Sequence, residues 1–207
     1  MKKFKKATWH HFLPYTPEEV RNTVRRLADA GFDMIIPCVK QATGIADFQS
    51  KIAPVREEFK SWDPLMVLAE EANRHNIAVH AWSCVAPEGK DSRLLAEHPE
   101  YETIEGPEKN RYGNLRLACL NRPEVRDYQA AIYQELLENY PIDGVHLDYV
   151  RFGRGFCYCD ICRADYKRLT GQELLELSTV DFNPNPAQDL DVWINWRTDV
   201  ITGFARR

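Results

Sequence analysis

The sequence predicts an α/β fold in which amphipathic helices pack on a parallel sheet. Strand-like segments alternate with helix-like ones along the chain, as they do in consecutive βαβ units. The links from helix to strand are short, whereas those from strand to helix are long. With 207 residues, of which 44% are hydrophobic, the chain can bury one core or form one large domain.

Four segments have the composition of strands, namely 7–12, 33–39, 77–85 and 142–150. The last alternates apolar and polar residues and ends in a carboxylate, Asp148. A charge in a buried strand is costly unless it is paired or used. Asp148 is therefore either a structural residue, paired with Arg151 or capping the next loop, or a catalytic one.

The first helix has a clear beginning and end. Thr16 and Glu19 form a capping box, and Pro17 takes the first helical position. Gly31 ends the helix, because glycine readily adopts the positive φ of a C-terminal cap.

Three further segments carry apolar side chains at helical spacing. The second helix starts at Asp63-Pro64, and the third starts at Asn121 with Pro123 in its first turn. A later helix covers about 193–204.

The long strand-to-helix links cover about 40–62, 86–121 and 151–188. In a parallel sheet these links all emerge at the carboxyl ends of the strands, where α/β proteins build their sites. This one-sided elaboration favours an enzyme or a ligand-binding protein.

Composition excludes several classes of function. A net charge of −4 with both signs interspersed argues against a nucleic-acid binder. No segment has the length and apolarity of a membrane span or of a signal peptide, so we expect a cytoplasmic protein. No glycine-rich phosphate signature follows a strand, so no organic cofactor is expected.

Polar and aromatic side chains share one parity on neighbouring strands. They are His80, Trp82 and Cys84 on the third strand, and His146 and Asp148 on the fourth. His10 and His11 point to opposite faces of the first strand, so one of them can join the same pocket. Each histidine taken alone is more simply explained as a hydrogen-bonded core residue, but three strands each place a polar or aromatic side chain on the same face.

A carboxylate in such a pocket has two chemical uses. It can act as a nucleophile or charge stabiliser in glycoside hydrolysis, or it can ligate a metal together with His10 or His11, His80 and His146. Glycoside hydrolysis also needs a general acid, and Glu88, Asp91 and Glu105 are weak candidates for that role.

Three of the six cysteines are clustered, at Cys157, Cys159 and Cys162. In a chain without a signal peptide this clustering favours a metal over disulfides. Cys119 is the best fourth ligand, since it lies in a loop on the same face. Four thiolates leave no open position, so the sequence predicts a structural zinc, the alternative being reduced thiols without metal.

The chain resembles glycoside-hydrolase-like (β/α)₈ proteins, including a family-10-like group of α-amylase-related glycosyl hydrolases. Residues 143–152 resemble their fourth-strand motif, and residues 63–72 and 77–82 resemble their second helix and third strand. Residues 121–126 resemble the segment that leads into their third helix. Separately, the cysteine cluster is similar to that of family 42 β-galactosidases, where it holds a structural zinc.

The resemblance implies a glycoside hydrolase that cleaves an O-glycosidic bond in a carbohydrate. Asp148 would take the position of the nucleophile of a retaining enzyme. His146 departs from the amylase pattern, which usually has Arg there, and Tyr149 has the opposite strand parity. The residues expected to bind substrate are His11, His80, Trp82, His146, Tyr149 and Arg151.

A complete (β/α)₈ barrel has eight strands and about 250 residues, whereas four strands are predicted here. We therefore expect 1–207 to be the N-terminal part of a single barrel domain, with about its first four βα units and the general acid beyond residue 207. Open sheet edges would favour a homo-oligomer. The alternatives are a metal-dependent hydrolase and a carbohydrate-binding protein without catalysis.

Overall fold

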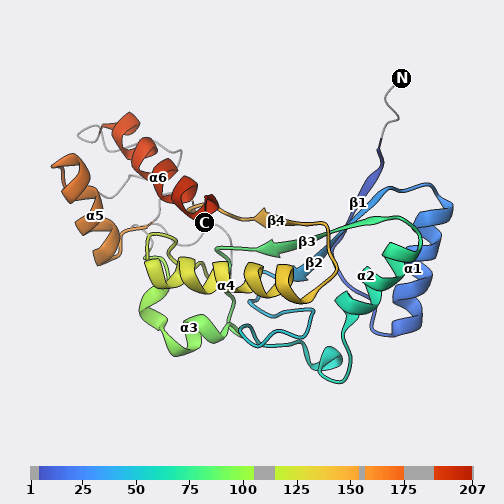
Figure 1. Cartoon of the computed structure of the whole chain (residues 1–207). Helices are drawn as coiled ribbons and strands as arrows, with labels where there is room; N and C mark the ends of the chain where they lie inside the picture. The colour runs from blue at the N-terminus through green and yellow to red at the C-terminus, as the bar shows by residue number, and fades with distance from the viewer. Residues whose placement is uncertain (1–4, 105–114, 154–156, 175–188, 207) are drawn as a thin grey trace.

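A computed structural model describes residues 5–104, 115–153, 157–174 and 189–206. Strands and helices alternate along the chain (Figure 1). The four strands are β1 (Ala7–His10), β2 (Met34–Lys40), β3 (Ala78–Cys84) and β4 (Gly144–Asp148). The helices are α1 (Pro17–Asp29), α2 (Pro64–Arg74), α3 (Arg93–Glu97), α4 (Pro123–Asn139), α5 (Asp160–Thr170) and α6 (Leu190–Ala205), with 3₁₀ turns at Glu57–Phe59 and Pro99–Tyr101.

The strands form one parallel sheet in the sequential order β1-β2-β3-β4. Crossovers between parallel strands are right-handed, so a sequential order places the connecting helices on one face. Figure 1 shows α1, α2 and α4 below the sheet, with α5 and α6 beyond the carboxyl ends of the strands. The predicted α/β fold is confirmed, and its sheet has the order found in (β/α)₈ barrels rather than in doubly wound folds.

The predicted helix signals act as expected. The Thr16 hydroxyl accepts from the Glu19 amide and donates to the Glu19 carboxylate, and Gly31 has a φ of 72° after α1. Asp63 caps α2 and also accepts a hydrogen bond of 2.6 Å from the Tyr140 hydroxyl after α4. That second bond ties the start of one helix to the end of another.

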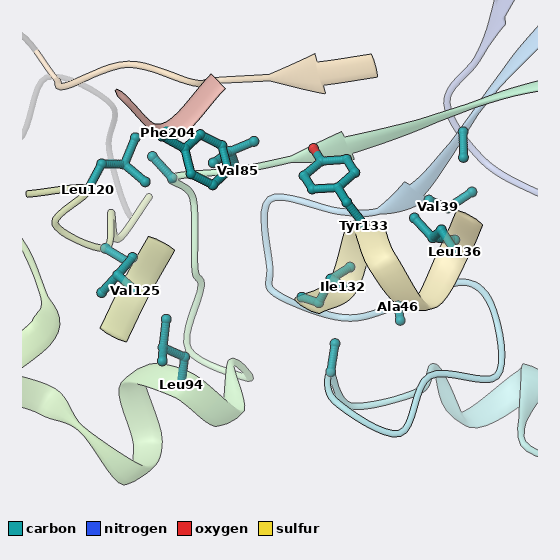
Figure 2. Close-up of a cluster of buried hydrophobic side chains, with 14 of the residues drawn as sticks. Val39, Ala46, Val85, Leu94, Leu120, Val125, Ile132, Tyr133, Leu136 and Phe204 are labelled. Carbon is teal, nitrogen blue, oxygen red and sulfur yellow. The ribbon is translucent and has the colours of Figure 1, made fainter. Parts of the chain in front are cut away.

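The main core lies between the sheet and its helices. Figure 2 shows Tyr133 and Leu136 of α4 beneath the strands, together with Val39 of β2. The Tyr133 hydroxyl donates to the carbonyl of Ser83 over 3.1 Å, so α4 is hydrogen-bonded to β3 as well as packed on it. A separate small cluster of Ile36, Cys38 and Trp82 occupies the opposite face, which is called the inner face below.

Some boundaries and one element differ from the expectation. The first strand ends at His10 rather than at residue 12, and the third helix begins at Pro123 rather than at Asn121. The link 151–188 contains the helix α5, which was not predicted from the sequence. Its residues pack against the cysteines and α6, so tertiary contacts rather than a strong apolar stripe maintain it. Within the described residues, no helix is long and apolar enough to cross a membrane.

Candidate active site and cysteine centre

The inner face of the sheet gathers the polar residues of β3 and β4. Their register pairs Trp82 with His146 and Cys84 with Asp148, so these four side chains lie on one face at the carboxyl ends of the strands. The two imidazoles also meet, with Nδ1 of His80 3.0 Å from Nε2 of His146.

Aromatic rings from β1 and the residue after it complete this inner-face cluster. The ring centroid of Trp82 lies 5.0 Å from that of Trp9 and 4.8 Å from that of His11, both edge-on. Trp9 also lies 5.6 Å from His146, and with 53% of its surface exposed it offers an accessible apolar ring. Trp9 is not among the residues predicted from the sequence, although it has the same strand parity as His11, which was predicted.

The first-strand histidines separate as their parity predicts. His11 contacts Trp82 in the inner-face cluster, whereas His10 lines a groove against α1 with Tyr15 and Arg26. Burial, followed by repulsion from His11, lowers the pKa of His10. His11 is therefore the one of the two that reaches the candidate site.

The inner-face cluster favours the uncharged form of His146. Burial, followed by the proximity of His80, lowers the pKa of His146 below its usual value. Trp82 is 7% exposed, and its indole N–H finds no hydrogen-bond acceptor within the described part of the chain. A buried donor without an acceptor is unfavourable, and an acceptor atom on a bound ligand would satisfy it.

Asp148 ends β4 at a strained turn. Its Oδ1 accepts a hydrogen bond of 2.7 Å from the amide of Tyr149, and Tyr149 has a φ of 49°. A bulky residue in the left-handed region costs about 1–3 kcal/mol and often marks a functional site. The strand alternation stops at Asp148, so strand parity does not determine the direction of the Tyr149 side chain.

Tyr149 and Arg151 lie next to Asp148 along the chain. The Arg151 guanidinium is 4.6 Å from the centroid of the Tyr149 ring, and both residues line a small hollow of about 10 Å³ with Leu115 and Leu117. They therefore border a hollow beside the strand end.

A buried ion pair lies behind the site. Lys40 Nζ is 2.7 Å from Glu88 Oε1 and donates to the carbonyl of Cys84 over 2.7 Å. The same Glu88 oxygen accepts a hydrogen bond of 2.6 Å from Gln129 of α4. Both charged side chains are fully buried, so Glu88 is committed to structure and does not fit the role of general acid. Asp91 is exposed, and Glu105 lies outside the described residues.

The four predicted cysteines come together. Their sulfur atoms all lie within 4.8 Å of one another, and all four residues are buried. Cys119 Sγ is 3.8 Å from Cys159 Sγ and 3.5 Å from Cys162 Sγ. Tetrahedral zinc with bonds of about 2.3 Å to sulfur requires about 3.8 Å between sulfurs, so the donor set fits this ion.

The environment of the quartet stabilises negative charge on sulfur. Cys157 Sγ accepts hydrogen bonds from the amides of Ile104 and Cys159, over 3.3 Å and 3.5 Å. Contacts from Cys119, Cys157 and Cys162 lower the pKa of Cys159, and the same mutual contacts raise that of Cys162. A bound cation would allow all four thiols to ionise.

The quartet also determines where the long loops lie. It joins the segment at Cys119 to the start of α5, and Tyr158 donates from its amide to the carbonyl of Ile104 over 3.0 Å. Within the described residues, it is the one group of three or more His, Cys, Asp or Glu side chains close enough to share an ion. A second metal site formed by His80, His146 and Asp148 therefore gains no support.

A sequential parallel sheet with a polar and aromatic cluster at its carboxyl ends defines a protein of the (β/α) barrel type, with its candidate site at the edge where such barrels build theirs. The model of the family described as Glycosyl hydrolase-like 10 matches residues 5–207. The chain therefore belongs to that family, which confirms the resemblance found in its motifs.

Individual proteins agree with this assignment. Glycosyl hydrolase DigH of Escherichia coli K12 is 26% identical over 206 residues, covering 79% of this chain and 45% of the relative. The chain thus spans less than half the length of that relative. Two solved structures share the fold at 19% identity and 98% coverage of this chain. They are α-L-fucosidase isoenzyme 2 from Paenibacillus thiaminolyticus (TM-score 0.64, 29% of that chain) and a β-galactosidase from Halorubrum lacusprofundi (TM-score 0.62, 34% of that chain).

Proposed function

We propose that this chain provides the nucleophile half of a glycoside hydrolase site, with Asp148 as the nucleophile. The observation that carries the proposal is the position of Asp148 at the carboxyl end of β4, beside an imidazole and indole cluster, in a chain of the glycosyl hydrolase-like family. We also propose that residues 1–207 form the first four βα units of a single barrel domain.

The chemistry assigned to Asp148 is attack on the anomeric carbon of a sugar. Its Oδ1 accepts from the Tyr149 amide, which holds the carboxylate in place. The second oxygen would form the bond to the anomeric carbon as the bond to the leaving oxygen breaks. Protonation of that oxygen requires a general acid, and we assign none among the described residues.

The inner-face cluster would bind the sugar. An exposed indole such as Trp9 offers an apolar surface for the C–H face of a pyranose ring, and the imidazoles of His80 and His146 offer hydrogen-bond donors and acceptors for its hydroxyls. His11 and Trp82 would form the floor of this subsite. Tyr149 and Arg151 would extend it on the far side of Asp148.

Turnover of activated aryl glycosides by the complete protein tests the proposal. We expect Asp148→Asn to lower kcat by several orders of magnitude, because the amide is a poor nucleophile. Asp143→Asn is the matched control, since Asp143 lies at the other end of β4 and uses its side chain to accept from the Val79 amide. Turnover unchanged in Asp148→Asn would refute the role.

Covalent trapping separates a nucleophile from a charge stabiliser. A 2-fluoro glycoside with a good leaving group forms a long-lived ester with the nucleophile of a retaining enzyme. We expect the added mass on the tryptic peptide that contains Asp148. Sugar binding without turnover or trapping would instead favour a carbohydrate-binding protein.

The cysteine quartet would hold a structural zinc that stabilises the loops after β3 and β4. When bound, the ion would be held by Cys119, Cys157, Cys159 and Cys162. We expect one zinc per chain by elemental analysis, and a lower thermal midpoint after Cys119→Ser. Cys38→Ser changes a buried cysteine outside the quartet and should keep the zinc. Equal zinc contents in both variants would contradict the assignment.

A further inference from the structure

Gly144 begins β4 directly opposite His80 of β3. A Cβ atom at position 144 would lie 3.1 Å from Cε1, 3.2 Å from Nδ1 and 3.3 Å from Nε2 of His80. These distances are shorter than the about 3.5–4.0 Å of a favourable contact between carbon atoms. The His80 ring therefore lies against the bare backbone of Gly144, a close approach of the kind that a glycine inside a strand often marks.

This position brings His80 to His146, which lies two residues after Gly144 in β4. Nδ1 of His80 is 3.0 Å from Nε2 of His146, and the ring planes meet at 68°, so the two imidazoles touch through these nitrogens and not face to face. The contact holds one hydrogen atom, because two N–H groups would repel each other and two lone pairs would form no bond. Burial, followed by the proximity of His80, lowers the pKa of His146, which agrees with a neutral ring.

One shared hydrogen couples the tautomers of two neutral rings. If Nε2 of His146 donates to Nδ1 of His80, both rings carry their hydrogen on Nε2; if Nδ1 of His80 donates instead, both carry it on Nδ1. The two remaining nitrogens, Nε2 of His80 and Nδ1 of His146, form no hydrogen bond within the described residues, and neither is fully buried. In either arrangement they offer one donor and one acceptor, and never two of a kind.

We propose that His80 and His146 act as one tautomer-coupled pair that binds two hydroxyl groups of a sugar, and that Gly144 is the positioning residue that makes room for it. A hydroxyl group can both donate and accept. One hydroxyl would accept from the free N–H of the pair, and a second would donate to the bare nitrogen. A ligand with two acceptors and no donor at these positions would leave one of its atoms unpaired.

The two parts of this inference have different foundations. The coupling depends only on the contact between the two rings and on the space above Gly144. The sugar as ligand rests on the proposed function, because the pair lies on the inner face two residues before Asp148. The experiments therefore measure the coupling without turnover and the ligand through turnover.

Nitrogen NMR of the folded protein labelled with ¹⁵N-histidine tests the coupling at slightly alkaline pH, since protonated and bare ring nitrogens differ in chemical shift. His80→Gln and His146→Gln assign the signals of each ring. We expect the same tautomer in both rings and a scalar coupling, across the hydrogen bond, between Nδ1 of His80 and Nε2 of His146. Unlike tautomers, or no coupling between these nitrogens, would overturn the proposal.

Gly144→Ala tests the positioning role. The added methyl group should displace the His80 ring and abolish the coupling between the two nitrogens. Gly203→Ala is the matched control, because a Cβ atom there meets nothing within 4 Å, and it should retain the coupling. A coupling that persists in Gly144→Ala would overturn the role of this glycine.

Kinetics test the ligand, with the 4-nitrophenyl glycoside that the complete protein cleaves fastest. We expect Gly144→Ala and His80→Gln to raise KM by about 5- to 50-fold with a smaller change in kcat, because the lost hydrogen bonds to hydroxyls form on substrate binding. Gly203→Ala should leave both constants unchanged. An unchanged KM in the first two variants would overturn sugar binding by the pair. A wild type that shows the coupling but cleaves no glycoside would refute the hydrolase, whereas the coupled pair would stand.

Discussion

Lys40 and Glu88 form an ion pair in which both side chains are fully buried, so its disruption has a large expected effect. Replacing Lys40 by Met retains the length of the side chain but leaves the Glu88 carboxylate without its cation. Removing one partner of a buried pair costs about 3–5 kcal/mol, because the remaining charge stays desolvated. The variant also loses the bond from Lys40 to the carbonyl of Cys84.

Urea unfolding followed by tryptophan fluorescence measures this effect. With an m-value of about 2–3 kcal/mol/M, a loss of about 3–5 kcal/mol lowers the midpoint by about 1–2.5 M. Lys60→Met is the matched control, because Lys60 pairs with Glu57 at the surface, where both side chains are mostly exposed. Such a pair contributes less than about 1 kcal/mol.

A second substitution separates unpaired charge from lost packing. Glu88→Gln removes the carboxylate but retains an oxygen that can accept from Gln129. Added to Lys40→Met, it should recover about 1–3 kcal/mol, because no buried charge then remains. A loss under about 1 kcal/mol in Lys40→Met, or no recovery in the double variant, would refute the reasoning.

Two further changes probe the site and the core. Burial and the neighbouring His80 lower the pKa of His146 from 6.5, so the folded state binds this proton less readily than the unfolded state. The contribution of His146 to the free energy of unfolding is therefore fully present above about pH 6.5 and is lost as the pH drops below it. We expect His146→Gln to reduce the fall in the urea midpoint between about pH 7.5 and about pH 5.5. An equal fall in the variant and the wild type would contradict this. Tyr133→Phe removes the donor to Ser83 and should cost about 1 kcal/mol by the same assay, whereas Tyr15→Phe, at an exposed ring, should be neutral.

The sequence by itself determined the features that depend only on neighbouring residues. The capping pair Thr16 and Glu19, the positive φ at Gly31 and the apolar stripes of α1, α2 and α4 are local features, because each depends on residues within a turn or two. The parallel sheet followed from alternation and loop length. Strand parity placed Trp82 with His146, because side chains on a strand alternate regardless of the rest of the fold.

Only the tertiary structure decided which residues that are far apart in the sequence come into contact. Trp9 joins the site through the pairing of β1 with β2, and α5 exists because the quartet and α6 hold it. Glu88, a weak candidate acid in the sequence, proved to be the partner of a buried lysine at the end of β2. Whether a carboxylate is free or paired depends on which groups the fold brings within a few ångströms, and local sequence does not encode that distance.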